Sequence, residues 1–173
     1  MMRNFLILFC VITIYSCKEQ LKEEVKFTEN SKVEVYNFAE LESFLKTHTD
    51  KIVVINFWAT WCKPCVKELP YFQELHDTFK NENLKVVLVS LDFPDKFESQ
   101  LIPFIKKNKL TPQVILLDDP DENTWIQKID ESWSGALPAT LIYSKSNSAF
   151  YEQSFTKESL FKEIDEFIKL EKL

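Results

Sequence analysis

Residues 58–65 read W-A-T-W-C-K-P-C, and this stretch decides how the rest of the chain is interpreted. Its two cysteines, Cys62 and Cys65, lie three positions apart with a proline between them. A pair this close forms a disulfide, half of a metal site or a redox couple. Each of these needs a different protein around it, so the surrounding sequence has to distinguish them.

Length and composition limit the choice. The chain has 173 residues, of which 45% are apolar and 14% aromatic, and this suits one domain that buries a core without cross-links. The net charge is −6, and acidic and basic residues are interleaved, which argues against a nucleic-acid partner. The single glycine excludes a glycine-rich phosphate-binding loop.

The N-terminus carries a targeting segment. Residues 5–14 are apolar apart from one threonine and follow Arg3. As a helix, ten residues rise about 15 Å, against about 30 Å for the hydrocarbon core of a bilayer, so we predict a cleaved signal peptide over residues 1–16. The sequence I-Y-S-C resembles a bacterial lipoprotein cleavage box, with Ile14 in place of the usual leucine. This implies lipid attachment at Cys17; the alternative is plain secretion with Cys17 as a free thiol.

Residues 17–32 are highly charged and contain few apolar side chains, which is typical of a solvated tether. Fully extended, such a segment reaches up to about 50 Å. We therefore expect a folded domain over residues 33–173, held at a membrane outside the cytoplasm, in the periplasmic space, as a lipoprotein.

Cysteine counting then excludes most roles for the central pair. The other two cysteines lie at or before position 17, so Cys62 and Cys65 are the only thiols of the predicted domain. A structural zinc site needs about four ligands, and the only histidines, His48 and His76, are interpreted as surface residues. An inert structural disulfide is disfavoured because a three-residue spacing closes too small a loop to stabilise much. A dithiol that cycles with a disulfide remains, with no metal.

Predicted strands and helices alternate along the domain. Strands are expected at 33–36, 51–59, 84–91, 114–117, 139–143 and 149–155, the last two forming a hairpin. Helices are expected after a capping box at Asn37, over 62–80 with Pro70 inside, over 95–110 with Pro103 splitting it or marking a later start, over 122–129, and after Thr156. This order predicts an α/β fold with a mixed sheet and helices on both faces.

The run F-W-A-T-W-C-K-P-C-V-K-E-L-P, residues 57–70, resembles the active-site segment of the thioredoxin superfamily. Its last three residues make it similar to the membrane-tethered extracytoplasmic thiol-disulfide oxidoreductases of the TlpA and ResA type. The likeness covers about residues 33–170. It implies a thioredoxin-like fold, an enzyme, and a redox-active disulfide between Cys62 and Cys65 in place of any cofactor.

Physical chemistry accounts for the residue types in the motif. A cysteine at the first turn of a helix meets unpaired backbone N–H groups and the positive end of the helix dipole, so Cys62 is predicted to be the nucleophile. Lys63 adds a positive charge beside it. Cys65, one turn further in, is expected to resolve the mixed disulfide. Pro64 lies where a missing N–H costs little and stiffens the loop.

Glu68 is a candidate proton acceptor. It lies three positions after Cys65, on the same helix face if the segment is helical. If that face points inward, desolvation raises the carboxyl pKa toward neutrality and lets the group exchange a proton with Cys65. The alternative is a solvated surface glutamate. Thioredoxins keep a buried aspartate on the preceding strand, where this chain has Asn56, so the resemblance implies that the role moves to Glu68.

A second wall of the site is predicted around Pro138. The superfamily places a cis-proline before a strand at this position, facing the cysteine pair, which exposes the backbone of Leu137 for pairing with a substrate chain. The alternative is an ordinary proline at a strand start. Gly135 is expected to serve close backbone approach or an unusual φ.

Three tryptophans complete the candidate site. Trp61 is expected to flank the nucleophile as an exposed contact surface, and Trp58 to pack beneath the loop. Trp133 either borders the same groove or packs in the core.

The predicted function is exchange of the dithiol with cysteines of extracytoplasmic proteins, as a reductant supplied by a membrane electron donor. Two alternatives stay open. A thiol peroxidase uses a related fold but usually places its cysteine in a T-x-x-C context, and a non-catalytic docking module would merely retain the cysteines.

Overall fold

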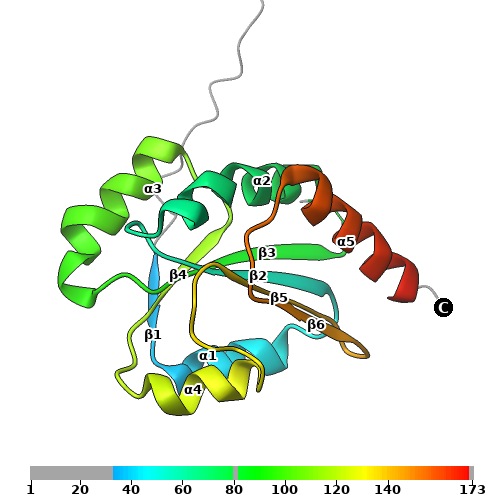
Figure 1. Cartoon of the computed structure of the whole chain (residues 1–173), viewed down its shortest axis with the longest axis horizontal. Helices are drawn as coiled ribbons and strands as arrows, with labels where there is room; N and C mark the ends of the chain where they lie inside the picture. The colour runs from blue at the N-terminus through cyan, green and yellow to red at the C-terminus, as the bar shows by residue number, and fades with distance from the viewer. Residues whose placement is uncertain (1–32, 80–81, 172–173) are drawn as a thin grey trace, which may run out of the picture.

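The computed structural model describes residues 33–79 and 82–171, which form a six-stranded mixed sheet with helices on both faces (Figure 1). The mixed α/β architecture predicted from the sequence is confirmed. The predicted signal peptide (1–16), the lipid-attachment residue Cys17 and the tether (17–32) lie outside the described residues and stay predictions.

The sheet has the order β1-β4-β3-β2-β5-β6. Strands β1, β4, β3 and β2 run parallel to one another, whereas β5 is antiparallel to β2 and β6 is antiparallel to β5. Every residue of β2 is buried, as expected of a central strand covered on both faces. The strands are β1 (Glu34–Tyr36), β2 (Ile52–Trp58), β3 (Leu84–Ser90), β4 (Gln113–Leu117), β5 (Ala139–Tyr143) and β6 (Ser148–Tyr151).

Helices cover the two faces unequally. Helices α2, α3 and α5 lie on one face and α1 and α4 on the other (Figure 1), and each set encloses its own hydrophobic cluster against the sheet. The strands alternate side chains between the clusters, so Val54 and Trp58 of β2 belong to the first and Ile55 and Phe57 to the second. The helices are α1 (Phe38–Thr47), α2 (Lys63–Phe79), α3 (Ile102–Asn108), α4 (Glu122–Ile129) and α5 (Lys157–Glu171).

Local sequence signals set several boundaries. The capping box is present: the Glu40 N–H donates to Asn37 Oδ1 at 3.0 Å, and the Asn37 N–H donates to Glu40 Oε2 at 2.9 Å. The segment 95–110 is not one helix but a 3₁₀ turn η1 (Pro94–Lys96), a π turn η2 (Phe97–Leu101) and then α3. Pro103 lies in the first turn of α3, where its missing N–H costs least, so the predicted break is confirmed.

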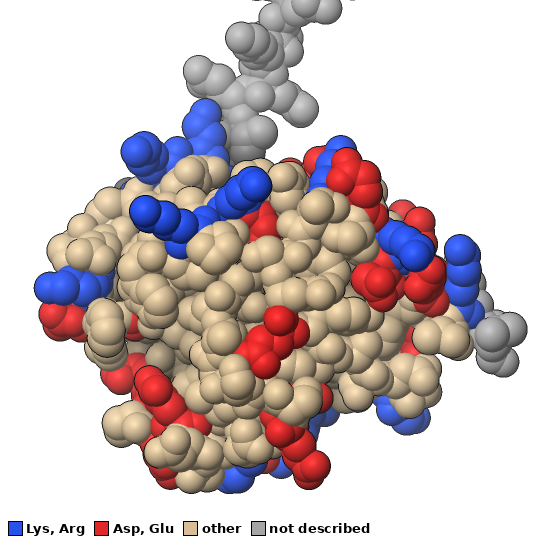
Figure 2. All heavy atoms as spheres, viewed as in Figure 1, with Lys and Arg blue, Asp and Glu red and all other residues tan. Residues whose placement is uncertain are grey.

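Two features of the surface were predicted from the sequence: interleaved charges and exposed histidines. Acidic and basic side chains are scattered over the face seen in Figure 2, with wide uncharged areas between them. The surface positions predicted for His48 and His76 are only partly correct, since both residues are half-buried and the His48 ring stacks on Phe44 with the centroids 4.2 Å apart.

In the described ranges, no helix has the length and apolar composition needed to cross a membrane.

Candidate active site

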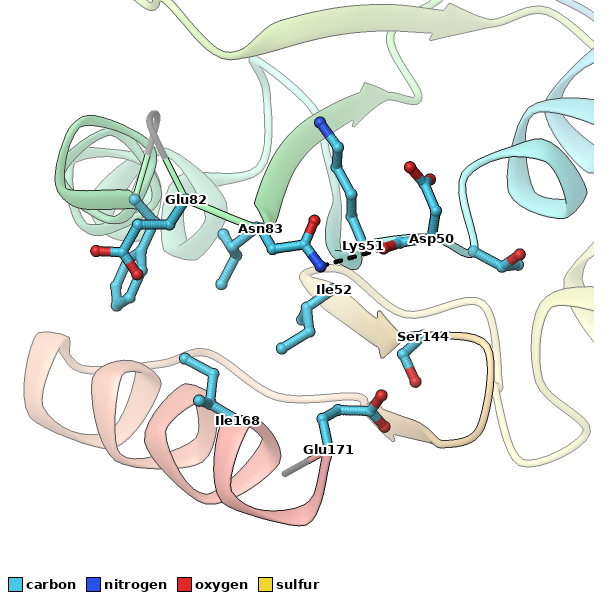
Figure 3. A pocket seen from close by; sticks show the side chains of 11 residues that line it. Asp50, Lys51, Ile52, Glu82, Asn83, Ser144, Ile168 and Glu171 are labelled. Atoms are coloured by element: carbon cyan, nitrogen blue, oxygen red, sulfur yellow. Dashed lines mark hydrogen bonds between the residues drawn. The ribbon is translucent and has the colours of Figure 1, made fainter. Parts of the chain in front are cut away.

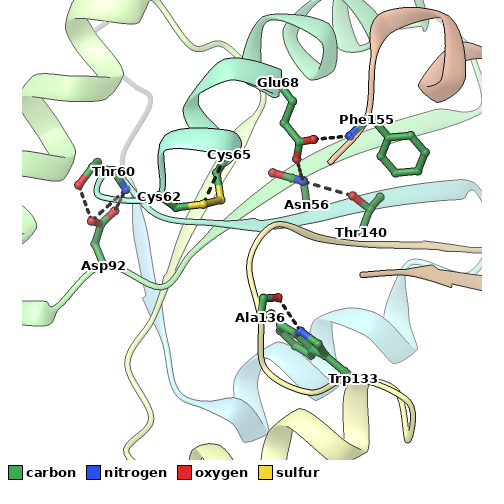
Figure 4. The surroundings of a disulfide bond; sticks show 10 residues. All are labelled: Asn56, Thr60, Cys62, Cys65, Glu68, Asp92, Trp133, Ala136, Thr140 and Phe155. Carbon is green, nitrogen blue, oxygen red and sulfur yellow. Dashed lines mark hydrogen bonds between the residues drawn. A yellow bond between two sulfur atoms is a disulfide. The ribbon is translucent and has the colours of Figure 1, made fainter. Parts of the chain in front are cut away.

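The cysteine pair lies where the central strand β2 meets helix α2. Cys62 and Cys65 form a disulfide, with their Cα atoms 5.3 Å apart (Figure 4). Cys65 is fully buried, whereas Cys62 keeps 6% of its surface exposed. The outer position predicted for Cys62 is therefore correct, although little of this residue reaches solvent in the disulfide form.

Cys62 takes the place of a helix cap. Its carbonyl accepts the Val66 N–H at 3.0 Å and its own N–H donates to the Ala59 carbonyl at 3.1 Å, so the chain turns sharply before α2 begins at Lys63. The Cys62 sulfur accepts the Cys65 N–H at 3.3 Å. A sulfur at this place accepts a backbone N–H of the first helical turn and faces the positive end of the helix dipole, and both favour a thiolate once the disulfide is reduced.

Glu68 points inward and not to solvent, so the surface alternative is wrong. Only 1% of its surface is exposed. Oε1 accepts Asn56 Nδ2–H at 2.9 Å and Oε2 accepts the Phe155 N–H at 2.7 Å (Figure 4). Desolvation raises the pKa of Glu68 from 4.5 to about 7, while the two hydrogen bonds hold it below what burial alone would give. The group is thus able to take up or release a proton near neutral pH.

Asn56 is a partner of Glu68, a role that the sequence analysis missed. Its side-chain amide also donates to Thr140 Oγ1 at 3.2 Å, which links β2 to β5 beneath the helix. Its Oδ1 is buried and has no hydrogen-bond partner among the residues that the structure describes. A polar residue in a strand otherwise made of apolar side chains was the signal that could have indicated this role.

The opposite wall is the loop before β5. The Leu137–Pro138 peptide bond is cis, as predicted. Gly135 has a φ of +92°, so the unusual φ, one of the two alternatives for this glycine, is confirmed. A Cβ there would also lie 3.1 Å from Cδ1 at the tip of the Ile126 side chain.

Hydrogen bonds from outside the loop fix its shape. The Glu152 carboxylate accepts the Ser134 N–H at 3.1 Å and the Ala136 N–H at 3.0 Å, and it also accepts the Ser134 hydroxyl. The Trp133 indole N–H donates to the Ala136 carbonyl at 3.0 Å. Trp133 is buried in the core and anchors the loop from below. No local sequence pattern indicates this role for Glu152.

The two walls enclose a cavity of about 550 Å³. It brings together five of the predicted site residues: Trp61, Cys62, Lys63, Pro64 and Leu137. Trp61 is 55% exposed and Phe93, which the sequence analysis did not single out, is 63% exposed. Trp58 is buried beneath the loop, as expected. The site thus combines the Cys62 sulfur with an apolar rim that is open to solvent.

A second cavity, of about 310 Å³, lies at the other end of β2 (Figure 3). Asp50, Lys51, Glu82 and Glu171 line it together with apolar residues of α2 and α5. It contains no cysteine and lies apart from the redox pair.

The sequence profile of the AhpC/TSA family matches residues 19–148, which is most of the chain. The chain belongs to the AhpC/TSA family. Among curated relatives of this AhpC/TSA protein, sporulation thiol-disulfide oxidoreductase A of Bacillus subtilis is 40% identical over 63 residues, which cover 36% of this chain and 38% of the relative. Thiol-disulfide oxidoreductase ResA of Bacillus thuringiensis is 37% identical over 81 residues, which cover 47% of this chain and 46% of the relative. The chain thus spans less than half the length of these two relatives.

Solved structures agree on the fold. A DsbF homologue from Corynebacterium diphtheriae superposes with a TM-score of 0.57 at 27% sequence identity and covers 70% of this chain and 75% of its own. The thioredoxin-like fold predicted from the sequence is confirmed.

Proposed function

We propose that this protein is a thiol-disulfide oxidoreductase that exchanges the Cys62–Cys65 dithiol with disulfides of partner proteins. The supporting observation is the placement of the pair: the Cys62 sulfur caps a helix at the edge of an open cavity, and Cys65 is bonded to it from one turn inside. The names of the ResA and sporulation relatives, both thiol-disulfide oxidoreductases, point the same way.

The first step starts from the reduced protein. The Cys62 thiolate attacks one sulfur of a partner disulfide, and a new S–S bond joins Cys62 to the partner as the partner's own S–S bond breaks. The second partner sulfur leaves as a thiolate and takes a proton from water. Backbone N–H groups at the start of α2 lower the free energy of the attacking anion.

The second step releases the partner. The Cys65 thiol passes its proton to the Glu68 carboxylate and, as a thiolate, attacks the Cys62 sulfur. The mixed disulfide breaks, the partner leaves with its second thiolate, and the Cys62–Cys65 disulfide forms, so two electrons have moved to the partner. In the disulfide form, both Glu68 oxygens already accept hydrogen bonds from other groups. Proton transfer from Cys65 to Glu68 therefore needs the carboxylate to rotate, or one water molecule to bridge the two side chains.

The loop before β5 suits an extended partner segment. Within residues 82–171, the hydrogen bonds of this loop engage the backbone of Ser134 and Ala136 and not that of Leu137. A partner chain lying in the cavity is therefore proposed to pair with Leu137 as an added strand, with Trp61 and Pro64 against its side chains.

We further propose that the protein works outside the cytoplasm as a reductant, anchored through lipid on Cys17. The apolar leader and the cleavage-box sequence support this placement. Its partners are then cysteine-containing extracytoplasmic proteins. A dithiol in an oxidising compartment must be reduced again after each turnover, which a membrane electron donor would do.

The test is the reduction of a protein disulfide, such as that of insulin, by the protein from residue 18 onward in the presence of excess dithiothreitol. The wild type should accelerate the reaction, and Cys62→Ser should lower the rate to that of dithiothreitol alone. A Cys62→Ser variant as fast as the wild type would contradict the proposal. Of the two alternatives, a peroxidase would consume hydrogen peroxide faster than the protein disulfide, and a docking module would do neither.

A further inference from the structure

A buried carboxylate lies at the base of the loop that carries Cys62. Asp92 follows β3 and has 2% of its surface exposed. Both of its oxygens accept the Thr60 N–H at 3.1 Å and Oδ1 accepts the Thr60 hydroxyl at 2.5 Å (Figure 4). Oδ2 also accepts the Ser90 hydroxyl at 2.8 Å. Neither the mechanism above nor the motif makes use of this group.

The hydrogen bonds around Asp92 suit a carboxylate. The Thr60 N–H can only donate, and the Thr60 and Ser90 hydroxyls are placed to donate to the two oxygens. None of the ion pairs in the described part of the chain involves Asp92. The side chain thus carries a buried negative charge that is hydrogen-bonded but not neutralised.

Asp92 is close to the nucleophile in the fold. Thr60, which it holds, lies two residues before Cys62 within the turn closed by the hydrogen bond from the Cys62 N–H to the Ala59 carbonyl. The two chain neighbours of Asp92, Leu91 and Phe93, line the same cavity as Cys62. The carboxylate therefore fixes the turn that presents the sulfur.

The other ionisable groups around the cysteines are either exposed or lie on the side of Cys65. Lys63 on α2 and Glu122 on α4 line the cavity but are exposed, so water and salt screen their effect on Cys62. Glu68 is buried on the side of Cys65 and binds Asn56 and Phe155. A buried charge is screened much less than an exposed one.

We infer that Asp92 is a positioning residue with two linked effects: it fixes the loop of Cys62 through Thr60, and its charge opposes the Cys62 thiolate and so makes the dithiol a stronger reductant. This inference deepens the proposed function and rests on it. The balanced reaction is protein dithiol plus glutathione disulfide giving protein disulfide plus two glutathione thiols. A charge that destabilises the thiolate raises the free energy of the reduced protein and not that of the neutral disulfide, and this drives the reaction toward the protein disulfide.

The test is Asp92→Asn, with two readouts in the protein from residue 18 onward. The first is the pKa of Cys62, from the ultraviolet absorbance of the thiolate against pH; the second is the equilibrium with glutathione. We expect the Cys62 pKa to fall by about one unit. At a pH at which Cys62 is a thiolate in both proteins, the equilibrium should move about tenfold toward the protein dithiol. An unchanged or raised Cys62 pKa would overturn the inference.

Thr60→Val is the matched control, since it removes one donor and keeps the charge. If Asp92 only held the loop in place, both variants would weaken the contact between the Cys65 N–H and the Cys62 sulfur and both would raise the Cys62 pKa. If the charge acts as inferred, the pKa falls in Asp92→Asn and does not fall in Thr60→Val. A fall of equal size in both variants would contradict the inference.

A measurement on the wild type covers the case in which Asp92→Asn fails to fold. In the reduced protein, the carbon NMR shift of the Asp92 carboxylate should change at the pH at which Cys62 ionises, and Cys62→Ser should lose this change. Absence of the change in the wild type overturns the inference. Because all these readouts use only pH and glutathione, they are independent of whether partner proteins are reduced, and each proposal can fail without the other.

Discussion

Replacing Glu68 by glutamine should change how the stability of the protein depends on pH. In the unfolded chain this carboxyl ionises near 4.5, whereas burial raises its pKa in the folded protein to about 7. Between these values the folded state holds a proton that the unfolded state has released, so the free energy of unfolding falls as the pH rises. From 4.5 to about 7, at about 1.4 kcal/mol per pH unit, the loss amounts to about 3 kcal/mol.

The assay is guanidinium denaturation of the oxidised protein at pH 5 and pH 8, followed by tryptophan fluorescence. Between these two values the wild type should lose about 2 to 3 kcal/mol more of its free energy of unfolding than Glu68→Gln does, because glutamine does not titrate. The disulfide stays closed in every sample, so the cysteines add no pH dependence.

Glu74→Gln is the control on the same helix. Glu74 is half-exposed and pairs with Lys157 at 2.6 Å, so its loss should change the free energy of unfolding by less than about 1 kcal/mol. If the difference between pH 5 and pH 8 is the same in Glu68→Gln as in the wild type, the carboxyl is not held near neutrality. The proton-transfer step assigned to it would then be refuted.

Three further predictions concern exchange. Asn56→Leu removes a hydrogen bond that lowers the pKa of Glu68, so the pH profile of partner release from a mixed disulfide should move to higher pH. An unchanged profile would count against a role for the Asn56 contact. Glu152→Ala frees the Ala136 N–H and loosens the loop before β5. The value of kcat/KM should then fall for protein disulfides and stay near the wild-type value for small aromatic disulfides. An equal fall for both substrates would be inconsistent with a docking role for this loop. The reduced protein should react with hydrogen peroxide far more slowly than with a protein disulfide, which a peroxide-consumption assay would check.

Elements with local signals were predicted correctly from the sequence. The apolar run of β2 and the capping box before α1 each lie within about ten residues, so local pattern alone indicates them. The W-C-K-P-C motif likewise contains both sulfurs and the start of helix α2.

Contacts between distant residues were not predictable in this way. Glu68 and Phe155 are 87 residues apart, and Thr60 and Asp92 are 32 apart. The three-residue spacing places Glu68 on the helix face of Cys65, but it indicates neither that this side chain is buried nor which polar group meets the carboxylate. For the same reason, the sequence does not indicate a particular role for Asp92 or Glu152, because their hydrogen bonds join segments that are distant along the chain.

The central claim is that Cys62 attacks and Cys65 releases, and trapping tests it most directly. Reduced Cys65→Ser, as the protein from residue 18 onward, is mixed with a protein disulfide, and the products are separated without reductant. We expect a one-to-one adduct joined through a disulfide to Cys62, which dithiothreitol cleaves. The matched Cys62→Ser variant should not form this adduct. If Cys62→Ser traps the partner as readily as Cys65→Ser does, or if neither variant traps it, the assignment of the two sulfurs is wrong.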